Sequence, residues 1–148
     1  MLTPWFVTGF CEGEAAFTYS RRGKGLELYF AIKSKADDRN LISQLRDFFG
    51  VGKIYEVKPR LPRAYSDNTT TAVYYRTSKI SQLELVVQHF DRYPLVGKKR
   101  LAYQIWKKMF LLKRNFRKPD FGRLQELAYA LSDLSSKNIA NRRKWQGK

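Results

Sequence analysis

The sequence predicts an α+β domain in which helices cover one face of an antiparallel sheet. Apolar residues repeat at helical spacing in some segments and alternate with polar residues in others. These segments follow one another in the order αββαββα, and further helices are expected at the C-terminal end. With 148 residues, of which 43% are hydrophobic, we expect residues 1–148 to form a single domain around one core.

A short apolar helix is expected first. Thr3 suits its N-cap and Pro4 its first helical position. The acids Glu12 and Glu14 stand at the far end, beside a glycine. Because so short a helix is marginally stable alone, we expect it to pack against another element.

Two hairpins are expected on either side of a second helix. From Ala16 the pattern alternates, and the turn Gly23-Lys24-Gly25 separates two strands that each have one apolar and one polar face. The second hairpin is expected near Lys53–Val57 and Ala72–Thr77, joined by a long basic loop. Both hairpins leave a polar face uncovered.

The remaining helices are predicted from caps and apolar stripes. Asp37 or Asp38 can cap a helix that Gly50 terminates. Ser81 has capping-box spacing to Glu84 and is expected to open a helix that ends before Tyr93-Pro94. Two more helices are expected near Gly97–Leu112 and Phe121–Leu134.

The charge balance points to a polyanionic partner. There are 29 Lys and Arg residues against 13 Asp and Glu, giving a net charge of +16. Such an excess destabilises a compact chain by self-repulsion, so we interpret it as a nucleic-acid-binding charge. A basic protein of ribosomal type is the alternative. A membrane partner is not expected, because the charge is spread along the chain and no apolar run reaches the roughly 18 residues of a membrane span.

The sequence also restricts the metal chemistry. Cys11 is the only cysteine and His89 the only histidine. An internal disulfide is therefore excluded, and a structural zinc site, which needs about four Cys or His ligands, is not expected. Any metal would have oxygen ligands.

The stretch VTGFCEGEA, from Val7 to Ala15, resembles the LAGLIDADG motif of homing endonucleases. The resemblance continues through FAIKSKADDRNLI, FFGVGKIY and QHFDRYPLVGKKRLAYQIWKKMF. Ala15 replaces the usual final glycine, and Glu12 replaces the usual first aspartate. Only one motif is present, and members of the family with one motif act as homodimers. The resemblance therefore implies the αββαββα fold of that family, with its sheet forming a DNA-binding saddle.

The same resemblance implies a function. The chain would be a site-specific, Mg²⁺-dependent endonuclease of intron-homing type that acts on double-stranded DNA. As a homodimer it would cut both strands of a long, nearly palindromic target and leave short 3′ overhangs. One helical turn of DNA per subunit gives a target of roughly 20 bp. Alternatives of the same fold are an intron maturase, whose partner is intron RNA, and a DNA- or RNA-binding protein without cleavage.

The resemblance assigns the metal site to the second acid of the motif. Glu14 would be the catalytic metal ligand, with the carbonyl of Gly13 beside it. Glu12 and Glu14 point about 200° apart on a helix, so they cannot both bind one metal ion. We therefore expect Glu12 to be peripheral. Mg²⁺ prefers oxygen ligands and keeps several waters, which suits one carboxylate per subunit.

Two further catalytic residues are implied by position. Lys99 matches the basic residue of the catalytic pocket, and its neighbour Lys98 is a rival. Ser34 aligns with a pocket position that is often glutamine in the family. The expected dimer interface is the apolar and glycine face of the first helix, namely Trp5, Phe6, Gly9, Phe10 and Gly13.

The uncovered strand faces would read DNA. A two-stranded ribbon fits the major groove, where every base pair is distinguishable. By alternation, the residues on these faces are Thr18, Ser20, Arg22, Glu27, Tyr29, Ala31, Lys33, Lys53, Tyr55, Tyr74 and Arg76. Phosphate contacts are expected from residues of the long loop and the C-terminal tail, namely Lys58, Arg60, Arg63, Arg142 and Arg143.

Overall fold

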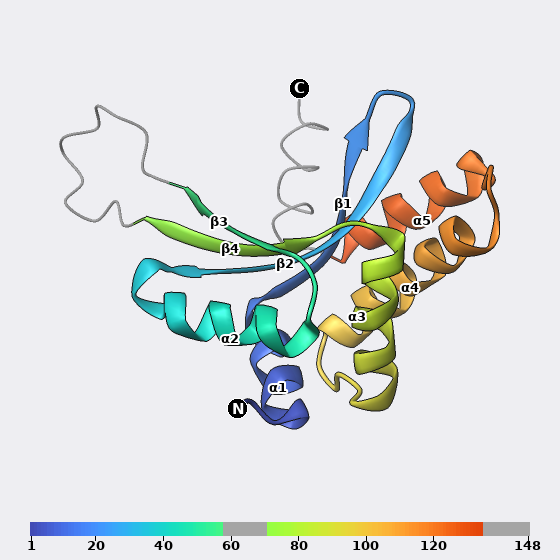
Figure 1. The fold of residues 1–148 in the computed structure, drawn as a ribbon. Coiled ribbons are helices and arrows are strands. Elements are labelled where there is room, and N and C mark those ends of the chain that lie inside the picture. Colours follow the sequence, from blue (N-terminus) through green and yellow to red (C-terminus); the bar gives the residue numbers. More distant parts are fainter. Residues whose placement is uncertain (58–70, 135–148) are drawn as a thin grey trace, which may run out of the picture.

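A computed structural model describes residues 1–57 and 71–134 and confirms the α+β class (Figure 1). A four-stranded antiparallel sheet has the strand order β1-β2-β4-β3, and α1, α2 and α3 lie below it in the view of Figure 1. None of the described helices is long and apolar enough to cross a bilayer. In chain order the elements are α1 (Pro4–Glu14), β1 (Ala15–Arg22), β2 (Gly25–Lys35), η1 (Ala36–Asp38), α2 (Arg39–Phe49), β3 (Lys53–Val57), β4 (Ala72–Thr77), α3 (Ile80–Arg92), α4 (Lys99–Asn115) and α5 (Phe121–Asp133).

The covered face of the sheet supplies the core. Phe17 of β1 is buried, and its ring centroid lies 5.1 to 5.3 Å from those of Phe30, Phe90, Tyr103 and Trp106. Each such aromatic pair contributes about 0.5–1.5 kcal/mol beyond the area it buries. Because these rings come from β2, α3 and α4, one side chain joins both sheet and helices.

A buried histidine connects α1 to α3. The Thr8 hydroxyl donates to the Tyr93 carbonyl at 2.8 Å, so its oxygen is left to accept from His89 Nε2 at 3.0 Å. The His89 ring packs edge-on against Phe48 and Phe49. Burial lowers the pKa of His89 from 6.5 to about 4, so the ring is neutral at pH 7.

The predicted capping box of α3 is wrong. The helix begins at Ile80, one residue before Ser81, and its N-cap residue makes no side-chain capping bond. Glu84 instead accepts two hydrogen bonds from Arg114 Nη1 of α4, at 3.1 and 3.2 Å. The capping bond that the Ser81–Glu84 spacing predicts does not form, because Glu84 binds a charged partner on α4 instead.

Other helix ends follow the prediction more closely. Gly50 ends α2 with a φ of 75°, which a glycine adopts without strain. Asp38 occupies the N-cap of α2 without a capping bond; its carboxylate accepts from the Ser34 hydroxyl at 3.1 Å. Helix α4 begins at Lys99 rather than at Gly97.

Candidate nucleic-acid interface

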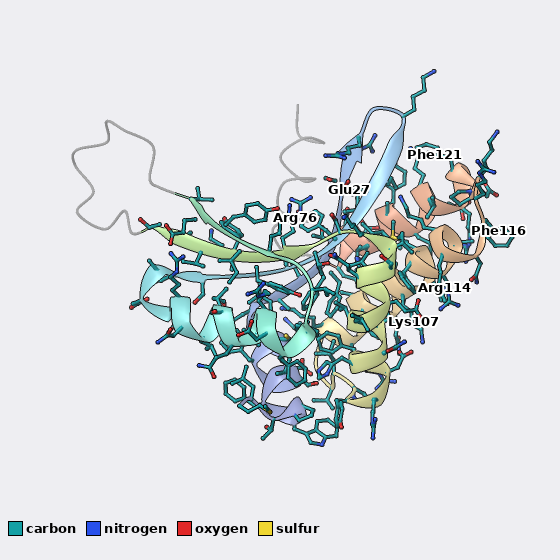
Figure 2. The ribbon with its side chains drawn as sticks, viewed as in Figure 1. Glu27, Arg76, Lys107, Arg114, Phe116 and Phe121 are labelled. Atoms are coloured by element: carbon teal, nitrogen blue, oxygen red, sulfur yellow. The ribbon has the colours of Figure 1, made fainter. Side chains whose placement is uncertain are left out.

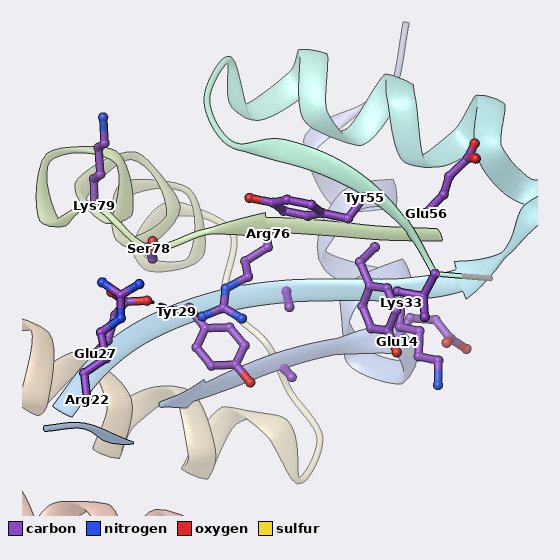
Figure 3. Close-up of a pocket in the computed structure, with 14 residues that line it drawn as sticks. Glu14, Arg22, Glu27, Tyr29, Lys33, Tyr55, Glu56, Arg76, Ser78 and Lys79 are labelled. Carbon is purple, nitrogen blue, oxygen red and sulfur yellow. Dashed lines mark hydrogen bonds and ion pairs between the residues drawn. The ribbon is translucent and has the colours of Figure 1, made fainter. Parts of the chain in front are cut away.

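The face of the sheet that no described helix covers, called the uncovered face below, lines a groove with a volume of about 1040 Å³ (Figure 3). Strands β1 to β4 all contribute to it, as do the last residue of α1 and the two residues after β4. The lining residues are Glu14, Ala16, Arg22, Glu27, Tyr29, Ala31, Lys33, Tyr55, Glu56, Val57, Tyr74, Arg76, Ser78 and Lys79. The groove therefore mixes acids, bases, aromatic rings and small residues.

Strand register places the residues predicted from alternation on this one face. Residues that face each other across an antiparallel ladder lie on the same side of the sheet. The relevant pairs are Thr18–Tyr29, Ser20–Glu27, Arg22–Gly25, Ala31–Arg76, Lys33–Tyr74, Lys53–Arg76 and Tyr55–Tyr74. Their contact with DNA stays a prediction. The predicted phosphate contacts Lys58, Arg60, Arg63, Arg142 and Arg143 lie outside the described residues.

A charged cluster holds one arginine of the groove in place. The Arg76 guanidinium lies over the Tyr29 ring, with its carbon 3.7 Å from the ring centroid. Glu27 accepts from Arg76 Nη2 at 3.3 Å and pairs with Arg22 Nη1 at 3.1 Å. Figure 2 shows Glu27 and Arg76 above the sheet, on the side away from α2, and Figure 3 shows both side chains in front of the strands. A stacked, ion-paired guanidinium is restricted in orientation and is suited to planar bidentate recognition.

Glu14 is one of three acids that line the groove in the described part of the chain, together with Glu27 and Glu56. Glu14 ends α1 and is exposed. The carbonyl of Gly13 belongs to the last turn of α1, whose carbonyls lack intrahelical partners. Among the described residues no group of three His, Cys, Asp or Glu side chains could hold a metal ion. One chain therefore offers a metal a single carboxylate and backbone oxygens, a donor set that suits Mg²⁺ when DNA oxygens and water complete it.

Lys99 is not among the residues that line the groove, but it lies near enough to Glu14 for their charges to interact. It is half-buried, whereas Lys98 is exposed. Burial lowers the pKa of Lys99, and the nearby groups Cys11, Glu14 and Glu12 partly oppose this shift. The charge of Lys99 therefore interacts with that of Glu14.

The structure does not bring Ser34 into the groove. In β2 the side chains of Phe30 and Ile32 point into the core, and Ser34 follows them on the same face. Its hydroxyl donates to Asp38, and it is absent from the groove lining. Lys33, one residue earlier, lies on the groove side instead.

The expectation that Glu12 lies outside the metal site stays a prediction, but sequence reasoning did not identify the partners of this residue. Its carboxylate accepts from the backbone amide of Val96 at 2.5 Å and from that of Gly97 at 3.2 Å. Both amides lie in the loop before α4. The sequence carries no signal of this contact, because every residue except proline has a backbone amide.

The remaining surface of α1 is apolar and open. Trp5 is 60% exposed and Phe6 45%, and the rings of Phe6 and Phe10 stack with centroids 6.2 Å apart. Apart from the backbone of the helix itself and the neighbouring residues, no atom of residues 1–57 and 71–134 lies within 4 Å of a Cβ atom built on Gly9 or Gly13. Packing within the described chain therefore gives no reason for glycine at either position.

Residues 7–110 match the LAGLIDADG endonuclease family. An uncharacterised 50.9 kDa protein in ND4 intron 1 of Podospora anserina is 31% identical over 77% of this chain and 25% of its own length. The probable intron-encoded endonuclease Cox1-I1b of Schizosaccharomyces pombe is 25% identical over 97% of this chain and 36% of its own length. The chain thus spans about a third or less of these two relatives.

Solved structures resemble the fold. The LAGLIDADG meganuclease I-AabMI bound to uncleaved DNA is 29% identical, with a TM-score of 0.66 over 90% of this chain and 43% of that one. I-SmaMI, bound to an uncleaved DNA target in the presence of calcium ions, has a TM-score of 0.73 at 24% identity. That match covers 95% of this chain and 49% of the other.

Proposed function

The chain belongs to the LAGLIDADG endonuclease family, and on this premise we propose that it is a site-specific endonuclease of intron-homing type that hydrolyses double-stranded DNA with Mg²⁺. One observation carries the proposal. Glu14 is among the residues that line the groove on the uncovered face, and its charge interacts with that of the half-buried Lys99. A protein that only binds DNA has no need of this pair beside its binding face.

The two charged residues have separate roles in the proposal. Glu14 would be a metal ligand, with the Gly13 carbonyl as a second oxygen donor. When bound, Mg²⁺ would neutralise phosphate charge and make water a better nucleophile. Lys99 would stabilise the negative charge that develops at the phosphate, and its partial burial makes that interaction stronger than it would be in bulk water. A related structure was obtained with DNA and calcium ions, which supports a divalent cation.

The sheet face would bind the major groove. Arg76 offers the two parallel donors that suit the O6 and N7 atoms of guanine, and Tyr29 gives it a rigid platform. Lys33 lies 5.5 Å from the Tyr74 ring centroid, so a second cation is partly ordered on this face. The basic residues of the long loop and tail stay proposed phosphate contacts.

We further propose that the active form is a homodimer joined through α1. A glycine inside a helix costs about 1 kcal/mol relative to alanine, and neither Gly9 nor Gly13 is required by packing within the described chain. A second α1 approaching closely would explain both glycines and the exposed Phe6 ring. Such a contact would bring two Glu14 carboxylates together, and the metal site would then draw on both chains.

Cleavage is tested on a library of plasmids with randomised inserts in Mg²⁺. We expect wild type to cut both strands of a small set of sequences and Glu14→Gln to bind them without cutting. Glu126→Gln, which changes an exposed acid of α5 outside the groove lining, should cut normally. Failure of the wild type to cut, together with tight binding to intron RNA, would favour the maturase alternative.

The homodimer is tested by measuring mass in solution and on DNA. Gly9→Leu should convert a dimer to a monomer, because a bulky side chain blocks the approach of two helices. Glu126→Leu adds the same side chain on α5 and should stay dimeric. A wild-type complex containing one protein chain per DNA target would refute the homodimer.

A further inference from the structure

We propose that Glu12 is a positioning residue, which ties the start of α4 to α1 and thereby sets the place of Lys99 relative to Glu14. The catalytic consequence rests on the proposed function of Lys99 and Glu14. The tie, meaning the hydrogen bonds from the Val96 and Gly97 amides to the Glu12 carboxylate, does not depend on that function, because it is a contact between described atoms.

Both oxygens of the Glu12 carboxylate take part in the tie. Oε1 accepts from the Val96 and Gly97 amides, and Oε2 accepts from Gly97 at 3.2 Å. Hydrogen bonds to an ionised acceptor are roughly twice as strong as neutral ones. A Cβ atom on Gly97 would lie 2.8 Å from Oε2, so a side chain at this position would force the Glu12 carboxylate to move.

The tied loop leads directly into the residue that it positions. Lys99 follows Gly97 by two residues and is the first residue of α4. The amide of Arg100 donates to the Gly97 carbonyl at 3.0 Å, so the tied residue is also bonded to the first turn of the helix. Val96, Gly97 and Lys98 are all exposed. Packing therefore does little to hold this stretch, and the Glu12 contacts hold it instead.

This arrangement gives the two acids of α1 complementary tasks. Glu14 at the helix end lines the groove, whereas Glu12 is absent from the lining and is occupied by backbone amides. Both carboxylates belong to α1. This helix therefore positions Glu14 directly, and through Glu12 it also positions the start of α4, where Lys99 lies. A misplacement of about 1 Å in a catalytic group can lower a rate by 10²-fold, so holding Lys99 matters for catalysis.

Two variants break the tie from opposite sides. Glu12→Ala removes the acceptor. Gly97→Ala displaces the Glu12 carboxylate but keeps every charge, which separates positioning from electrostatics. We expect each variant to lower the single-turnover cleavage rate by about 10–100-fold and to leave DNA affinity unchanged, as for other residues that orient a catalytic group. Glu126→Ala, an exposed acid of α5, should match wild type in both measurements.

A double-mutant cycle shows whether Glu12 acts through Lys99. In a Lys99→Ala background, Glu12→Ala should cause no further loss of rate, because the group that it positions is gone. An equal loss in both backgrounds would overturn the inference. Unfolding by denaturant identifies any variant that loses rate simply by failing to fold.

NMR tests the tie without cleavage. Reductive methylation with ¹³C-formaldehyde gives each lysine a resonance, and Lys99→Arg identifies that of Lys99. Glu12→Ala and Gly97→Ala should shift the Lys99 resonance and speed hydrogen exchange at the Val96 amide, while Lys118 on the α4–α5 loop stays unchanged. Unchanged Lys99 and Val96 signals would refute the tie. If the wild type does not cleave but these signals change, the proposed function fails and the tie stands.

Discussion

Acidification should destabilise the protein through His89. This histidine is 9% exposed, donates to Thr8, and has a pKa lowered by burial from 6.5 to about 4. The folded state keeps the ring neutral, whereas the unfolded chain binds a proton near pH 6.5. This difference in pKa contributes to the free energy of unfolding. The contribution is present above pH 6.5 and is lost as the pH falls towards 4.

The size of the effect follows from the pKa difference. At 1.36 kcal/mol per pKa unit, the shift from 6.5 to about 4 corresponds to about 3 kcal/mol. Linkage gives a loss of about 2 kcal/mol between pH 7 and pH 5 and of about 3 kcal/mol by pH 4. Typical domains have only 5–15 kcal/mol of total stability, so this loss is large.

Urea unfolding of wild type and His89→Gln at several pH values measures the loss. Other groups also titrate on acidification, so the informative quantity is the difference between the two proteins. We expect His89→Gln to be less stable at pH 7 and the gap to narrow by about 2 kcal/mol at pH 5. The sequence has a single histidine, so the ring also gives one NMR signal whose titration reports its pKa directly. A constant gap, or a pKa near 6.5, would refute the reasoning.

Two further predictions concern a turn and the groove. Gly52 has a φ of 94°, and a Cβ atom there would lie 2.6 Å from the Tyr75 ring; Gly52→Ala should therefore lower the free energy of unfolding by about 2–4 kcal/mol, measured with denaturant, and a loss below 1 kcal/mol would contradict the geometry. Arg76→Lys should weaken discrimination at one base pair by about 1–3 kcal/mol in competition binding, because lysine cannot stack flat or donate two parallel bonds. Glu27→Gln should weaken discrimination at the same base pair by a smaller amount. An unchanged base preference in both variants would show that Arg76 does not contact that base pair.

The sheet face was predictable because alternation determines it. Side chains in a strand point to opposite sides with a period of two, so buried Phe30 and Ile32 place Tyr29 and Lys33 on the other face. The same rule, applied two residues further, places Ser34 on the core side. Its expected place in the catalytic pocket came from the resemblance alone.

The tie between Glu12 and the loop before α4 was not predictable in this way. The partners are backbone amides 84 and 85 residues away, and they leave no mark in the pattern of side chains. The capping-box prediction for Ser81 failed for a related reason, since a distant arginine was a better partner for Glu84 than the nearby backbone. Local rules describe elements well, whereas contacts across the fold depend on how the elements meet.

Glu27 adds a competitor to a face proposed for a polyanion. Its carboxylate pairs with Arg22 and Arg76 in the free protein, so under the proposed function DNA would have to displace it before either guanidinium could engage fully. A random sequence offers only phosphate charge in exchange, and the ion pairs reduce the counterion release that drives such binding. A target with matching base edges would offer the two arginines hydrogen bonds that replace those to Glu27. The cluster would therefore shorten the time spent at wrong sites and favour a rapid search along DNA.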